Sequence, residues 1–202
     1  LVCSDMYIID GEGKQTADSI TKIRRRHVLR SGSGLTEGLL ISNFVTGCTM
    51  LVRREAAQAA MPFCPYMVHD HYIALCCSAV GEIYSVAWPL IRYRVHGRNQ
   101  TSVLAGVTDR DSYRRERIDL PLHKFQWLEQ CFPHKDAFRE EISRRMDWMY
   151  ARQNNWNRRG GAGTVWKCRR FSPLASLFEL SARWLPDSVL MWAVHLSQKN
   201  MI

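Results

Sequence analysis

A short polar run at the start of an expected helix carries the clearest chemical signal in the sequence. His69, Asp70 and His71 precede apolar residues at helical spacing, and this pattern predicts a helix over residues 70–80. A carboxylate in the first turn lies near free backbone N–H groups and the positive end of the helix dipole, which keep it ionised. Asp70 can therefore act as a general base that removes a proton from an attacking hydroxyl. The alternative, which spacing alone favours, is that Asp70 only caps the helix.

A second candidate is a run of alternating basic side chains after an expected strand: Arg92, Arg94, His96 and Arg98. On an extended segment all four lie on one side. Guanidinium groups that converge there suit a diphosphate or another anion, and a neutral His96 can ligate a divalent metal. A solvated edge of a sheet explains the same pattern equally well.

Zinc and disulfide sites are not supported. The seven cysteines are odd in number and form no C-x-x-C, so they are interpreted as reduced thiols in a cytosolic protein. His69 and His71 are two residues apart and cannot share one helix face, as His-x-x-x-His ligands do.

The elements that must position these residues are strands and helices in alternation in the first half of the chain. In the second half they are helices. Strands are expected over residues 1–9, 44–52, 83–87 and 90–93, and helices over residues 53–60, 70–80, 173–183 and 187–198. Residues 11–37 are expected to form a long loop with one short helix. The pattern predicts an α/β domain with a mixed sheet over residues 1–104 and an α-helical extension over residues 105–202.

Composition and charge restrict the class of protein. The 202 residues are 46% hydrophobic and 23% charged, which disfavours disorder and coiled coils. The net charge is +9, and residues 151–202 hold eight basic and two acidic residues. Such a tail suits an anionic membrane surface or nucleic acid. Nucleic acid is disfavoured as a partner because no aromatic interleaving and no known module accompany the arginines.

The chain opens inside an apolar, strand-like run. Residues 1–9 (LVCSDMYII) start without Met, a turn or a signal peptide. We expect a fragment whose N-terminal part is missing; the alternative is a chain trimmed at a natural boundary.

Four segments in order resemble bacterial family 2 glycosyltransferases of the rhamnosyltransferase-like group. The segments are LVCSDMYIIDG (residues 1–11), NFVTGCTM (43–50), MVHDHYIAL (67–75), and GEIY with PLIRYRVHGRNQ (81–84 and 89–100). The resemblance covers about residues 1–104, half of the chain, and the tail is only loosely similar to C-terminal helices of such enzymes.

This resemblance implies a fold and a set of roles. The family has a nucleotide-sugar-binding α/β domain of the GT-A type, and Asp70 occupies the position of its catalytic base. Asn43, Thr46, Gly47 and His69 fall where the sugar and the acceptor bind. Arg94 falls near the donor diphosphate and His96 near its divalent metal, Mg²⁺ or Mn²⁺.

The sequence also departs from the family. His71 and Tyr72 stand where the family has a double Trp. The family's Asp-x-Asp metal motif is missing, since Asp109-Arg110-Asp111 has the spacing but follows the core in a polar linker. The chain therefore resembles the acceptor-side half of a GT-A domain, and alone it is expected to be inactive.

The expected function is sugar transfer from a nucleotide-diphosphate sugar to a surface polysaccharide or lipid-linked glycan, with a rhamnosyl donor as the sharper hypothesis. The alternative is a non-catalytic membrane-surface or interaction module. The protein is expected to be cytoplasmic and peripheral at the inner face of the cell membrane, through residues 171–196 and the arginines beside them. A competing interpretation packs Leu177, Trp184 and Trp192 back on the catalytic domain.

Overall fold

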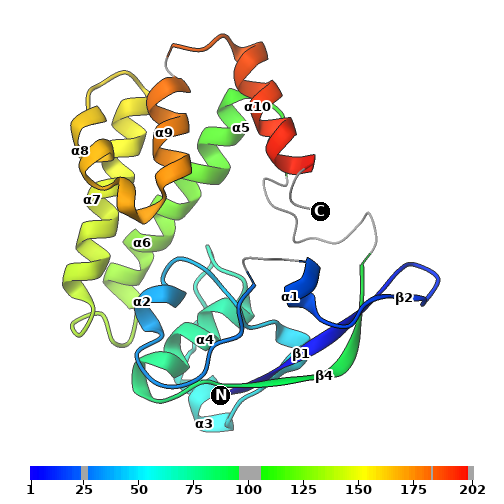
Figure 1. Cartoon of the computed structure of the whole chain (residues 1–202). Coiled ribbons are helices and arrows are strands. Elements are labelled where there is room, and N and C mark those ends of the chain that lie inside the picture. Colours follow the sequence, from blue (N-terminus) through cyan, green and yellow to red (C-terminus); the bar gives the residue numbers. More distant parts are fainter. Residues whose placement is uncertain (24–26, 96–105, 183, 200–202) are drawn as a thin grey trace. The chain divides into compact units, whose positions relative to one another are not determined.

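The chain forms two compact units. A computed structural model describes residues 1–23, 27–95, 106–182 and 184–199 (Figure 1). Leu1–Gln100 with Phe132–His134 make the first, which we call the sheet unit, and Thr101–Cys131 with Lys135–Met201 make the second, the helical unit. The boundary predicted at residues 104 and 105 lies outside the described residues.

The sheet unit is built around one buried strand. Strand β1 (Val2–Ile9) pairs in parallel with β4 (Tyr84–Arg94) along its whole length. Its other edge pairs antiparallel with β3 (Met50–Leu51) at one end and β2 (Gln15–Ala17) at the other. The fold is thus α/β with a small mixed sheet, as predicted, and the first strand lies inside this sheet rather than at an open edge.

Strand β4 corrects the prediction of two short strands. It runs without a break through Trp88 and Pro89, because β1 supplies a continuous partner. Proline has no N–H to donate, so the ladder bulges at this point: Ser4 pairs with Val86, whereas Asp5 pairs with Pro89. The extra residues turn outward, and Trp88 is 76% exposed.

The predicted strand over residues 44–52 is also wrong in most of its length. Only Met50–Leu51 is a strand, and Gly47–Thr49 forms a 3₁₀ turn. The loop expected over residues 11–37 contains β2 and two short helices, α1 (Ile20–Ile23) and α2 (Thr36–Leu39).

The two helices that follow are confirmed. Helix α3 spans Arg54–Ala59 and helix α4 spans His69–Val80. Residues 72–78 of α4 are all buried. That burial holds α4 in the core and places its first turn at the half-exposed rim.

The helical unit confirms the predicted α-helical extension. It contains α5 (Arg110–Arg114), a π-helical turn (Arg115–Asp119), α6 (Leu120–Cys131), α7 (Arg139–Trp156), α8 (Ala162–Lys167), α9 (Pro173–Ala182) and α10 (Asp187–Lys199). In its core the Tyr113 ring stacks on Trp156, with ring centroids 5.0 Å apart. No helix among the described residues is both long and apolar enough to cross a membrane.

Candidate functional site

Asp70 is held by a segment far from it in the sequence. Its Oδ1 accepts a hydrogen bond from Asn43 Nδ2 at 3.1 Å, and its Oδ2 accepts one from the backbone N–H of Gly47 at 2.9 Å. The N-cap position of α4 is Val68, which makes no side-chain cap. The interpretation of Asp70 as the N-cap residue is therefore wrong, because the carboxylate faces residues 43–47.

Asn43 orients both this segment and the carboxylate. Its Oδ1 accepts from the Val45 N–H at 2.9 Å, and its Nδ2 also donates to the Val45 carbonyl at 2.6 Å. A side chain that binds the backbone two residues on mimics a turn. This turn directs residues 43–47 toward α4 and leaves too few residues for the strand that the apolar pattern predicted.

Gly47 is needed for the close approach. A Cβ atom at this position would lie 3.0 Å from His69 Nε2 and 3.5 Å from Asp70 Oδ2. The 3₁₀ turn itself is closed through Thr46, whose carbonyl accepts from the N–H and the hydroxyl of Thr49, both at 2.9 Å. Thr46 thus stabilises the 3₁₀ turn through its backbone carbonyl. The exposed imidazole of His69 lies beside Gly47.

The structure adds two contacts that sequence reasoning missed. His71 Nε2 lies 2.5 Å from the carbonyl oxygen of Leu39 and ties α4 to the end of α2. Cys48 is exposed on the same turn as Gly47. Partial desolvation raises the pKa of Cys48, and the nearby Asp70 carboxylate acts in the same direction. Both contacts join residues more than 20 positions apart, so no local pattern signals them.

This geometry leaves Asp70 able to react. An ionised carboxylate offers about four lone-pair sites, and the two hydrogen bonds to Asn43 and Gly47 use one on each oxygen. Asp70 is half-buried, so the residue is not enclosed in the core. The carboxylate is thus oriented and open to a substrate, as a general base must be.

Arg94 lies at the turn that follows β1. Arg94 ends β4 beside Ile9, and its Nη1 donates to the carbonyls of Asp10 and Gly11 at 2.9 and 2.7 Å. Its guanidinium therefore holds the turn after β1. Arg92 and Arg94 are both exposed, in agreement with the alternation. His96 and Arg98 lie outside the described residues.

A divalent metal stays a prediction. The part of the chain that the structure describes contains no cluster of three His, Cys, Asp or Glu side chains that could bind one. Asp109 instead caps α5, where its Oδ1 accepts from the Ser112 N–H at 2.7 Å. His96, the metal ligand that the resemblance implies, lies outside the described residues.

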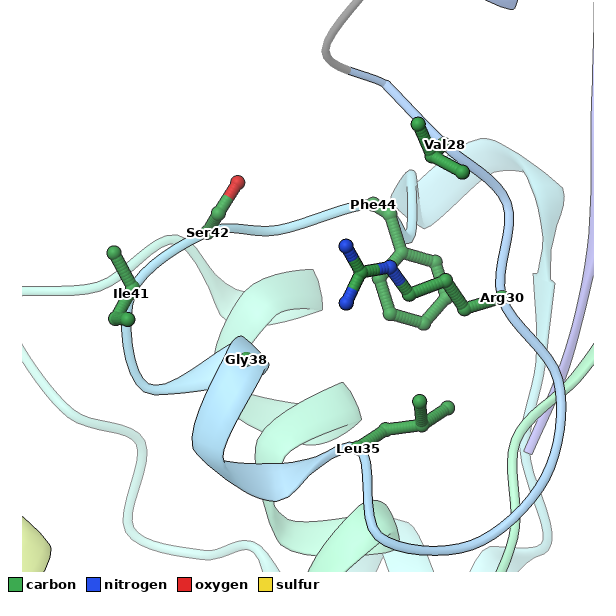
Figure 2. Close-up of a pocket in the computed structure, with 7 residues that line it drawn as sticks. All are labelled: Val28, Arg30, Leu35, Gly38, Ile41, Ser42 and Phe44. Atoms are coloured by element: carbon green, nitrogen blue, oxygen red, sulfur yellow. The ribbon is translucent and has the colours of Figure 1, made fainter. Parts of the chain in front are cut away.

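A shallow pocket of about 220 Å³ lies beside Asn43 (Figure 2). Its lining is mostly apolar and consists of Val28, Arg30, Leu35, Gly38, Ile41, Ser42 and Phe44. Figure 2 shows the Arg30 guanidinium pointing into it. Because Ser42 and Phe44 flank Asn43, the segment that orients Asp70 also borders this pocket.

No protein-family model, curated protein or solved structure matches the chain. The function is therefore inferred from the residues of the site and from the resemblance of its segments.

Proposed function

We propose that the chain is the acceptor-side part of a GT-A glycosyltransferase, and that Asp70 is its general base. The substrates are a nucleotide-diphosphate sugar, with rhamnose as the favoured sugar, and a glycan acceptor. One observation carries the proposal: two groups from a different segment hold the two oxygens of a half-exposed carboxylate. Both groups, Asn43 and Gly47, belong to a segment that the resemblance also assigns to this site.

The reaction follows from this arrangement. An acceptor hydroxyl donates a hydrogen bond to a free lone pair of Asp70. Its oxygen attacks the anomeric carbon in line, the bond from that carbon to the diphosphate oxygen breaks, and the hydroxyl proton moves to Asp70. Asn43 and Gly47 fix the orientation of the carboxylate, so little rotational entropy remains to be lost when the transition state forms. Attack from the face opposite the diphosphate inverts the anomeric centre.

His69 and Thr46 complete the proposed acceptor side. The exposed imidazole of His69 lies beside Gly47 and can bind a sugar hydroxyl. Thr46 closes the turn that presents Gly47. Roles for Arg94 at the donor diphosphate and for His96 at Mg²⁺ or Mn²⁺ rest on the resemblance alone.

The test is sugar transfer by the proposed whole transferase, in which the acceptor-side part is joined to a nucleotide-binding part. Transfer is measured as nucleotide diphosphate release that depends on added acceptor. Asp70→Asn keeps the size of the side chain, and we expect it to lower kcat by about 100-fold or more, the usual effect of losing a general base. Asp18→Asn is the matched control, since Asp18 is an exposed carboxylate that pairs with Lys22, and we expect normal kcat. Near-normal transfer by the Asp70→Asn variant would exclude Asp70 as the base. A wild-type protein without any transfer favours the alternative, a non-catalytic membrane-surface or interaction module.

A further inference from the structure

Helix α9 (Pro173–Ala182) differs from an ordinary surface helix, because it buries two polar residues and exposes two leucines, although its Phe178 packs on Tyr113 at 5.3 Å between ring centroids. An ordinary surface helix buries its apolar stripe and exposes its polar face. In α9 the buried residues are Ser176, Glu179 and Ala182. Leu174 and Leu177 face outward, 71% and 50% exposed.

A buried ion pair explains this difference. The Glu179 carboxylate accepts hydrogen bonds from Arg152 Nε at 2.7 Å and Nη2 at 2.5 Å, and from the Tyr113 hydroxyl at 3.1 Å. The Glu179 carbonyl accepts from Asn155 Nδ2 at 3.0 Å. Because a buried charge needs its partners, this network fixes the inward face of α9. The leucines are left on the outside.

The same network changes the surface charge of this part of the chain. Glu179 is the only acidic residue between Arg158 and Pro186, and its side chain is 0% exposed. The basic residues described there are all exposed; they are Arg158, Arg159, Lys167, Arg169 and Arg170. The surface of this segment is therefore cationic, with no exposed carboxylate among its described residues.

Exposed apolar and basic side chains follow one another along a continuous stretch of the sequence that covers α8, the turn after it and α9. We call this the α8–α9 patch; it consists of Trp166, Lys167, Arg169, Arg170, Leu174 and Leu177. Trp166 is 50% exposed. The Arg169 guanidinium lies 4.3 Å from the centre of the Trp166 ring and donates to the Trp166 carbonyl at 2.9 Å. Tryptophan, leucine and basic side chains in one patch are the combination that binds the interface of an anionic bilayer.

We propose that the α8–α9 patch binds the surface of an anionic membrane. Leu174, Leu177 and Trp166 enter the boundary between headgroups and acyl chains, and the basic side chains bind lipid phosphates. A second copy of the chain is a poorer occupant, because a two-fold contact brings the same patch against itself and so opposes cations with cations. This inference rests on the helical unit alone and is independent of the proposed sugar transfer.

The experiment is flotation of the full chain with two kinds of vesicle, one of pure phosphatidylcholine and one of equimolar phosphatidylcholine and phosphatidylglycerol. Three variants are compared with wild type: Lys167→Gln/Arg169→Gln/Arg170→Gln, Leu174→Gln/Leu177→Gln, and the control Trp88→Ala/Leu90→Gln. The control changes two side chains of the sheet unit that are 76% and 67% exposed. Circular dichroism melting checks that each variant is folded.

We expect wild type to partition on the anionic vesicles much more strongly than on the neutral ones. Each basic residue near the surface strengthens binding by about fivefold, so the triple charge variant should lose about 100-fold. Each leucine should contribute roughly tenfold, and the control should bind as wild type does. Added salt should weaken binding by screening.

Three results would overturn the proposal. The first is equal binding of wild type to both kinds of vesicle or to neither. The second is undiminished flotation of the two patch variants. The third is a concentration-dependent dimer in light scattering that the Leu174→Gln/Leu177→Gln variant abolishes while its flotation is unchanged, which would assign the patch to self-association.

Discussion

The contact between Asn43 and Asp70 can be tested without any assay of function. We expect Asp70→Ala to destabilise the start of α4 by about 2–3 kcal/mol. Two hydrogen bonds to a charged acceptor at 3.1 and 2.9 Å are lost, each worth about 1.5 kcal/mol or less because the groups are half-exposed. The favourable interaction of the carboxylate with the helix dipole, about 0.3–1 kcal/mol, is lost as well.

Hydrogen exchange of the backbone amides of α4 measures this directly. Residues 72–78 are buried, so their exchange reports opening of the helix, and 1.4 kcal/mol corresponds to about a tenfold faster exchange. Peptides from α6 are the internal control. They belong to the helical unit, and we expect their exchange to be unchanged.

A double-mutant cycle isolates the contact. Asn43→Ala alone removes the turn at Val45 as well as the bond to Asp70, so its own effect is ambiguous. The coupling between Asn43→Ala and Asp70→Ala should be about 1 kcal/mol. Additivity within about 0.3 kcal/mol would show that the two side chains do not support each other, and the geometry of the candidate site would be refuted.

Two further predictions concern stability. Glu179→Gln leaves the buried Arg152 without its counter-charge and should destabilise the helical unit by about 3–5 kcal/mol in urea unfolding. The control Glu116→Gln, at a pair with an exposed arginine, should cost less than about 1 kcal/mol. Equal losses of stability in the two variants would contradict the role of the buried pair. Burial raises the pKa of the Cys76 thiol from 9.0 to about 11, so the folded state keeps the thiol neutral after the unfolded chain has ionised. Stability should therefore be intact below pH 9 and fall by up to about 2–3 kcal/mol as the pH rises from about 9 to about 11, and a Cys76→Ala variant that shows the same fall in alkaline melting curves would assign it to other groups.

Local pattern was sufficient for three elements of the sheet unit. The strand over residues 1–9 and the helices at Arg54–Ala59 and His69–Val80 were predicted within a residue or two. In β1 and α4 the preference of the backbone and burial agree, since most of their residues are buried. Helix α3 buries no residue, and Pro62 follows its end. The same pattern with the resemblance singled out Asn43, Gly47 and Asp70, but it did not show that they touch.

Tertiary contacts decided the positions of Asp70, β4 and Arg94, because each of these contacts a partner far away in the sequence. Spacing alone favoured Asp70 as a cap of its helix, yet its carboxylate meets residues 27 and 23 positions away. Two predicted strands became one because β1 lies beside both. Arg94 donates to the backbone of the turn after β1, more than 80 positions away.

The same distinction holds in the tail. Its basic charge can be counted from the sequence, and its helices follow from spacing. Leu177, Trp184 and Trp192 are exposed. The period of α9 shows that Leu174 and Leu177 share a face but not which way that face turns. Its direction is set by the ion pair between Glu179 and Arg152, 27 residues apart, because a buried charge is far more costly to leave unpaired than two leucines are to leave in water.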